Sequence, residues 1–174
     1  RYEVGRRDAE FDQKRAAVLH VYKEVESLNH GLVTGASREA ATVTVTYDER
    51  PWIQALGVTT PDRPPVPGVH ASHIRDYEYK RLGTVSLLAG LDLHSGKVTE
   101  IVNDTHKSRD FIEFLTKLDA SYPAAQTLRL ILDNHSAHIS RETQRYLATR
   151  PQRFQFIFIP KRGSWLNLVE NLFS

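Results

Sequence analysis

Residues 128–135 have the sequence Leu-Arg-Leu-Ile-Leu-Asp-Asn-His, and this stretch decides the fold. Its first five residues are almost all apolar, which is typical of a strand buried on both faces of a sheet. Asp133 follows at the carboxyl end of the predicted strand, before a polar Asn-His-Ser-Ala-His loop. In sheets covered by helices, ligands bind in the crevice outside the carboxyl ends of the strands. Asp133 is therefore the first candidate for a functional residue.

Four further strands are predicted around this one. Strict alternation of apolar and polar residues predicts a strand at Thr42–Asp48. The same alternation at Thr84–Leu93, then a turn and an apolar return at Val98–Val102, predicts a hairpin. Phe154–Ile159 is a second apolar run, ended by Pro160, and predicts another buried strand.

Helical spacing of apolar residues indicates helices over the following ranges: 8–28, 108–122 with Ser108 as N-cap, 140–149 with Ser140 as N-cap, and a last one from Ser164. Residues 29–40 are expected to be a loop. Residues 50–83 lack periodicity and hold five of the eight prolines, which predicts a second, long loop. Three sequential strands followed by alternating helices and strands indicate an α/β fold with a mixed sheet flanked by helices.

Composition narrows the class of protein. A chain of 174 residues fits one domain, and 40% hydrophobic with 25% charged residues is ordinary for a globular protein. With no cysteine, the chain has no disulfide, thiolate metal site or cysteine nucleophile. Apolar runs fall short of the roughly 18 residues that a membrane span needs, and we do not expect the polar residues 1–10 to act as a signal peptide. A net charge of +2 allows a polyanionic partner.

Both ends of the chain suggest that it is an internal piece. It begins at Arg1, contains no methionine, and stops inside an apolar-periodic segment at Ser174. We therefore expect further protein on either side.

Two other carboxylates occupy places comparable to that of Asp133. Asp48 is expected to close the first strand, and Glu170 to lie two turns inside the last helix. Clustered carboxylates raise one another's pKa unless cations neutralise them. Mg²⁺, with Mn²⁺ as its substitute, suits carboxylates and phosphate oxygens. An Asp at a strand end is usually a solvated turn residue and a helical Glu usually faces water, so position alone favours Asp133. Asp92 competes with Asp48, but its tight turn favours a structural role.

The histidines and basic residues suggest secondary roles. His135 and His138 are three residues apart and could bind zinc, but no further ligand is obvious, so we interpret them as loop histidines near a phosphate or behind a metal ligand. Basic residues that could hold a phosphate backbone end the long loop or precede the last helix: Arg75, Lys80, Arg81, Lys161 and Arg162.

Four ordered motifs resemble the transposases of bacterial insertion sequences in the mariner superfamily. The motifs are Tyr47-Asp48-Glu49 with Trp52-Ile53-Gln54-Ala55-Leu56, Tyr79-Lys80-Arg81-Leu82-Gly83-Thr84, Leu132-Asp133-Asn134-His135-Ser136-Ala137-His138, and Pro160 with Ser164 through Ser174. The resemblance implies a ribonuclease H-like, mixed five-stranded sheet with an N-terminal helical extension. It also implies that Asp48, Asp133 and Glu170 hold two Mg²⁺ or Mn²⁺ ions.

The resemblance further implies what such a chain does. Transposases of this kind hydrolyse transposon ends and then join the freed 3′-hydroxyl to target DNA, typically at a TA step. The implied partners are DNA and a second subunit, the latter held partly by residues 50–83, with no membrane. We expect a cytoplasmic, nucleoid-associated bacterial protein. Lys80, Arg81, His138, Lys161 and Arg162 are the expected DNA contacts, with His138 also a candidate for supporting a metal ligand.

The domain expectation has two parts. Residues 1–40 would be a helix and linker from a missing DNA-binding region, and 41–174 a catalytic core truncated at its C-terminus. The 36 residues between Asp133 and Glu170 slightly exceed the commonest family spacing. Two alternatives remain open: a nuclease of the same fold that does not join strands, and a non-catalytic DNA-binding or dimerisation remnant.

Overall fold

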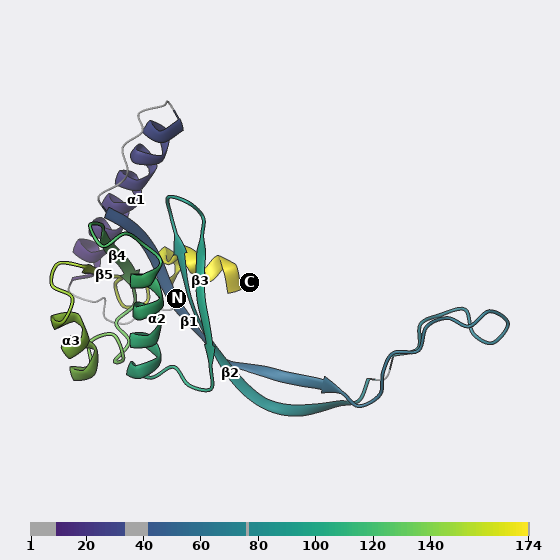
Figure 1. The fold of residues 1–174 in the computed structure, drawn as a ribbon. Helices are drawn as coiled ribbons and strands as arrows, with labels where there is room; N and C mark the ends of the chain where they lie inside the picture. The colour runs from purple at the N-terminus through teal and green to yellow at the C-terminus, as the bar shows by residue number, and fades with distance from the viewer. Residues whose placement is uncertain (1–9, 34–41, 76, 174) are drawn as a thin grey trace, which may run out of the picture.

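The computed structural model describes residues 10–33, 42–75 and 77–173, and its centre is one five-stranded sheet. The strands are β1 (Thr42–Val58), β2 (Tyr79–Asp92), β3 (Val98–Asn103), β4 (Thr127–Leu132) and β5 (Phe154–Phe158). They lie in the order β3-β2-β1-β4-β5 (Figure 1). The pairs β1–β2 and β2–β3 are antiparallel, and the pairs β1–β4 and β4–β5 are parallel. This mixed sheet confirms the predicted ribonuclease H-like class.

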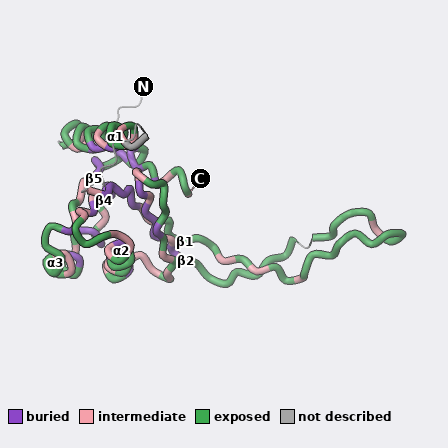
Figure 2. The backbone as a smooth tube through the Cα atoms, turned by 45° about the horizontal axis from the view of Figure 1, so that its top comes forward, coloured by how far each residue is buried: buried purple, intermediate pink, exposed green. Residues whose placement is uncertain are grey.

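Helices cover both faces of the sheet, as Figure 2 shows. On one face, α2 (Ser108–Ala120) packs Phe111, Phe114 and Leu118 against β1, β2 and β4. α3 (Arg141–Ala148) lies beside α2 on that face. Burial of each large apolar side chain contributes roughly 1.5–3 kcal/mol, so α2 anchors this layer.

The other face is covered by α1 (Phe11–Val33), whose apolar stripe packs on β4 and β5. Val18, Val21 and Val25 of this helix share a cluster with Ile131 and Ile159. The predicted N-terminal helix is therefore present, and it continues five residues into the stretch expected to be a loop. Residues 8–9 and 34–40 of these two predictions lie outside the described residues.

The prediction of one long loop over residues 50–83 is wrong at both ends. β1 continues to Val58 and β2 begins at Tyr79, so the two strands form an arm that projects from the body (Figure 1). Both faces of the arm are exposed, and the pairing shifts register between Arg50 and Ile53 and again before Leu56. Without a buried face, no period of two marks these strands. Pro51, which lacks an N–H, lies within the first shift, where a proline is tolerated.

The last predicted helix is also wrong in kind. The segment consists of two short 3₁₀ helices, η1 (Ser164–Leu166) and η2 (Leu168–Phe173), and Gly163 rather than Ser164 is the N-cap. Asn167 separates them in an extended conformation, with φ −91° and ψ 104°. Its side chain donates a buried hydrogen bond to the carbonyl of Tyr47 at 2.8 Å, which explains the interruption.

The other elements agree closely with prediction. The β2–β3 hairpin, the buried strand β4 and the Ser140 cap of α3 are confirmed; the cap oxygen accepts from the Thr143 N–H at 3.1 Å. The N-cap of α2 is Lys107 and not Ser108, because the Asp110 carboxylate accepts a hydrogen bond from the Lys107 backbone N–H at 2.7 Å. No helix in the described part of the chain is long and apolar enough to cross a membrane.

Candidate active site

The parallel pairing of β1 with β4 places Asp48 opposite Asp133. The last paired residues are Thr46 and Ile131, and continuing this register by two residues brings the two aspartates level. Neighbouring strands lie only about 4.8 Å apart, so the two side chains share one edge of the sheet. Asp48 does not close its strand as expected, since β1 continues into the arm. It does lie just beyond the point where β4 ends.

Asp133 is held by the loop that follows it. Its Oδ1 accepts the His135 backbone N–H at 2.9 Å and lies 3.3 Å from His138 Nδ1. Burial alone raises the pKa of this carboxyl, but the hydrogen bonds from His138 and His135 outweigh burial and lower the pKa below its usual range. Asp133 is therefore ionised at neutral pH, as a cation ligand must be.

The pKa of Asp48, in contrast to that of Asp133, is raised. Burial raises its pKa to about 7, and the charges of Glu49, Asp133 and Glu170 add to that rise; only the Glu49 backbone N–H, which donates to Asp48 Oδ1 at 2.8 Å, opposes it. Asp133 and Glu170 are thus both close enough to act on Asp48. A cation bound beside Asp48 would stabilise its ionised form.

Glu170 reaches this edge of the sheet because η1 and η2 are fixed to β1. The Asn167 bond to Tyr47 is one tie, and the Arg50 guanidinium, which donates to the Phe173 carbonyl at 2.7 Å, is another. The Glu170 N–H donates to the Asn167 carbonyl at 3.1 Å, so Glu170 begins one turn after the tie. The segment differs from the expected helix, but it brings the predicted residue to Asp48.

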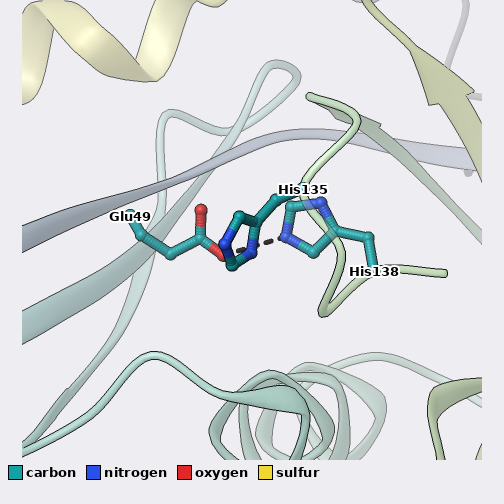
Figure 3. Close-up of side chains that lie close together, drawn as sticks. All are labelled: Glu49, His135 and His138. Atoms are coloured by element: carbon teal, nitrogen blue, oxygen red, sulfur yellow. Dashed lines mark hydrogen bonds and ion pairs between the residues drawn. The ribbon is translucent and has the colours of Figure 1, made fainter. Parts of the chain in front are cut away.

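A buried hydrogen-bond network behind Asp133 contains Glu49, which the sequence analysis did not single out as a site residue. The Tyr47 hydroxyl donates to Glu49 Oε1 at 2.9 Å, and the same oxygen lies 2.8 Å from His138 Nε2. His138 Nδ1 lies 3.0 Å from the Asp133 carbonyl oxygen, and the His138 side chain is 1% exposed. Figure 3 shows Glu49 and His138 joined, with His135 beside them. Alternation on β1 was the available signal, since it turns Tyr47 and Glu49 to the face opposite Asp48.

His138 is consequently positively charged over a wide pH range. Burial alone lowers its pKa, but hydrogen bonds to Asp133 and Glu49 and the charge of Glu49 raise it to about 9. Of the two roles suggested for His138, its burial and its contacts correspond to support of Asp133. No surface of this ring is available to DNA in the structure.

Four of the five candidate basic residues fall into two groups, while the fifth, Arg75, forms an ion pair with Asp62. Lys161 and Arg162 line a cavity of about 410 Å³ together with Asp133, Asn134 and Ser164. Lys80 and Arg81 are exposed on β2 opposite Gly57 and Leu56, in the arm. The structure thus brings only the first pair next to Asp133.

Asp92, the competitor of Asp48, has a structural role. It is buried, and its carboxylate accepts hydrogen bonds from the His94 N–H, the Ser95 hydroxyl and the Tyr122 hydroxyl. These contacts close the β2–β3 turn and tie it to the end of α2.

The fold is that of a ribonuclease H-like protein, and Asp133 and Glu170 lie close enough to Asp48 to raise its pKa. Comparison with known proteins agrees: a family model described as DDE superfamily endonuclease matches residues 57–174, and the chain belongs to this family. The match includes Asp133 and Glu170 but starts after Asp48.

A curated relative and two solved structures were also found. The chain is 43% identical over 89 residues to the "insertion element IS630 uncharacterized 39 kDa protein" of Shigella sonnei, covering 50% of this chain and 25% of the relative. The similarity extends over a quarter of that protein. Together with the family match, it confirms the resemblance to DDE proteins of bacterial insertion elements.

The fold is also similar to a chain of a simian T-cell lymphotropic virus intasome, with TM-score 0.51, 16% identity, and 78% and 39% of the two chains covered. The HTLV-2 integrase catalytic core gives TM-score 0.41 at 13% identity, over 65% and 59% of the chains.

Proposed function

We propose that this chain is the metal-dependent catalytic domain of a DNA transposase. It cleaves phosphodiester bonds at transposon ends and transfers the 3′-hydroxyl strand to target DNA. Asp48, Asp133 and Glu170 are its catalytic residues and its metal ligands. The reaction takes place in the bacterial cytoplasm, where the nucleoid DNA lies.

One observation carries this proposal: three carboxylates from separate elements lie near one edge of the sheet, where Asp133 and Glu170 are close enough to raise the pKa of Asp48. β1 and β4 contribute Asp48 and Asp133 in register, and η2 contributes Glu170. Burial and the charges of Glu49, Asp133 and Glu170 raise the pKa of Asp48, and a cation bound there would offset both effects. An all-oxygen donor set of this kind fits Mg²⁺ or Mn²⁺ better than a softer ion.

Each residue has a distinct task in this proposal. Asp133, ionised and held by His138, offers a ligand that is ready at neutral pH, whereas Asp48 releases its proton as a cation binds. Two bound ions would activate the attacking oxygen and stabilise the leaving oxygen of the phosphodiester. Lys161 and Arg162 border the cavity beside Asp133 and would hold the DNA backbone there by phosphate contacts.

The arm supports a role in assembly. It carries a series of exposed apolar side chains: Trp52, Leu56, Val58, Val66, Val69, Tyr77, Tyr79 and Leu82. Exposed apolar surface of this extent is typical of an interaction site. We propose that it contacts a second copy of the chain in an active homodimer, with Lys80 and Arg81 facing DNA.

The test is Asp133→Ala in the full-length protein. We expect loss of Mn²⁺-dependent nicking of transposon-end DNA, with an unchanged circular dichroism spectrum because Asp133 is half-exposed. Asp12→Asn, on the exposed side of α1, is the matched control and should nick normally. Undiminished nicking by Asp133→Ala would refute the assignment.

Pre-cut transposon ends separate the proposal from its alternatives. Joined products show a transposase, whereas cutting without joining indicates a nuclease of the same fold. Calorimetry that finds no Mg²⁺ or Mn²⁺ binding at millimolar concentration would favour the non-catalytic remnant.

A further inference from the structure

Behind the three carboxylates, Glu49, His135 and His138 form a second group of ligand-type side chains. One ligand atom from each lies within 4.8 Å of the other two. Figure 3 shows the His135 ring beside the contact between Glu49 and His138. The side chains of Glu49 and His138 are only 8% and 1% exposed. Asp48 and Glu170 do not belong to this group.

The hydrogen bonds of His138 orient it as a metal ligand. Its Nδ1 lies 3.0 Å from the carbonyl oxygen of Asp133, which can only accept, so Nδ1 carries a proton. Its Nε2 then faces Glu49 Oε1 at 2.8 Å, and a proton or a cation must lie between them. Metal-binding histidines typically donate their other ring N–H to a carbonyl or carboxylate, as His138 does.

His135 supplies the third ligand that the sequence alone did not reveal. Its Nδ1 is buried and has no hydrogen-bond partner among the residues that the structure describes. A buried polar nitrogen without a partner is uncommon in proteins. The two histidines are joined by a turn, in which the His138 N–H donates to the His135 carbonyl at 3.1 Å, and their rings lie 5.6 Å apart.

The donor set selects the kind of ion. Two imidazole nitrogens and one carboxylate suit Zn²⁺ and similar transition metals, whereas Mg²⁺ prefers oxygen ligands. Ligands of a tetrahedral Zn²⁺ lie roughly 3.3 Å apart, given metal–ligand distances of about 2.0–2.2 Å. The 2.8 Å between Nε2 and Oε1 would therefore widen slightly, and His135 would move inward.

We propose that Glu49, His135 and His138 form a binding site for Zn²⁺ or a similar divalent transition metal, separate from the carboxylate site. The ion would replace the proton between Glu49 and His138 and would tie β1 to the loop after β4. The His138 N–H would still donate to Asp133, so both sites could be filled together. This inference does not require that the chain be a transposase.

The test measures Zn²⁺ by calorimetry in the full chain carrying Asp48→Asn and Glu170→Gln, which disable the carboxylate site. We expect one Zn²⁺ to bind. Adding His135→Ala should weaken binding by more than the roughly 10–100-fold that loss of an outer partner costs. His20→Ala, an exposed histidine on α1, is the matched control and should leave affinity unchanged.

Two outcomes would overturn the inference: no Zn²⁺ binding in the carboxylate-disabled chain, or equal affinity with and without His135. Neither outcome depends on DNA cleavage, so the proposed function would stand. Because His135 is only half-buried, its removal should not unfold the protein, and a thermal melt checks this. Co²⁺ gives a second measurement, since its visible spectrum should change on His135→Ala and Glu49→Gln but not on His20→Ala.

Discussion

Asp48 and Asp133 are the same chemical group a strand apart, yet their pKa values move in opposite directions. Burial and neighbouring carboxylates raise the pKa of Asp48 to about 7. The hydrogen bonds of His138 and His135 overcome burial at Asp133 and lower its pKa. Pairs of titratable groups driven apart by their surroundings are typical of active sites. Of these two aspartates, only Asp48 has surroundings that disfavour its ionised form.

At the residue scale, we predict that Asp48→Asn stabilises the metal-free protein. The pKa of Asp48 is 3.8 in the unfolded chain and about 7 in the folded protein. Its contribution to the stability of the fold is therefore fully present below pH 3.8 and is lost as the pH rises towards 7. Asn is uncharged at every pH, so Asp48→Asn does not lose this stability as the pH rises. Near pH 4, where Asp48 is protonated in the folded wild type, the two proteins should be equally stable. Above pH 7 the free energy of unfolding of Asp48→Asn should exceed that of the wild type by on the order of 1–3 kcal/mol. Urea unfolding at several pH values, without divalent ions, measures the difference.

The control for this prediction is again Asp12→Asn, which should follow the wild type at every pH. A constant difference between Asp48→Asn and wild type from pH 4 to 8 would contradict the prediction. Added Mg²⁺ should stabilise the wild type and have little effect on the variant.

At the element scale, the interruption between η1 and η2 determines where Glu170 lies. Asn167 leaves the helical conformation and donates to Tyr47, the residue before Asp48. A continuous helix from Ser164, as its sequence suggests, would lack this tie. Of the two ties between this segment and β1, the buried one from Asn167 lies nearer to Glu170 in the chain.

We predict that Asn167→Ala costs about 1–3 kcal/mol of stability, since it leaves the Tyr47 carbonyl without its partner. The Mn²⁺ concentration for half-maximal nicking should rise and kcat should fall, with KM for DNA little changed, because Glu170 is displaced rather than the DNA contacts. Asn171→Ala, at an exposed position of η2, should change none of these. A wild-type Mn²⁺ requirement in Asn167→Ala would show that the tie does not position Glu170.

The sequence predicted those elements that have at least one buried face or a local cap. β4, the β2–β3 hairpin and the Ser140 cap of α3 belong to this class. It failed for the arm strands, where no face is buried, and at Asn167, where a contact 120 residues away overrides helical spacing. The site followed the same rule. Asp133 stood out by its buried strand. For Glu49, alternation on β1 indicated the face but not the contact with His138, which lies 89 residues away in the sequence.

At the scale of the whole molecule, the arm stands apart from the folded body (Figure 2). Between Val58 and Tyr79, two isolated bridges and an Arg75–Asp62 ion pair hold it together, and its residues are nearly all exposed. The arm therefore adds little to the stability of the sheet, and its apolar side chains are free for intermolecular contact.

We predict that replacing residues 60–77 with Asn-Gly leaves the core folded but abolishes dimers. Thr59 and Glu78 already face each other, with a hydrogen bond from Thr59 N–H of 3.4 Å, and Asn-Gly closes such hairpins tightly. The melting temperature should change little. Light scattering on the full-length protein with end DNA should show monomers. Arg75→Gln, which removes the ion pair but keeps the apolar surface, should still give dimers. Dimers in the shortened protein would show that residues 60–77 are not the part of the arm that holds the subunits together.

The hydrogen bonds that position the site join residues far apart in the sequence: Glu49 and His138 are 89 residues apart, and Tyr47 and Asn167 are 120 residues apart. Contacts between residues so distant in sequence form slowly and late during folding. A chain emerging from the ribosome can pair β1 with β2 long before β4 is synthesised, and η2 comes after both. A partly folded chain thus holds at most two of the three carboxylates in place. Cutting activity is, for this reason, expected to appear only with the complete native structure.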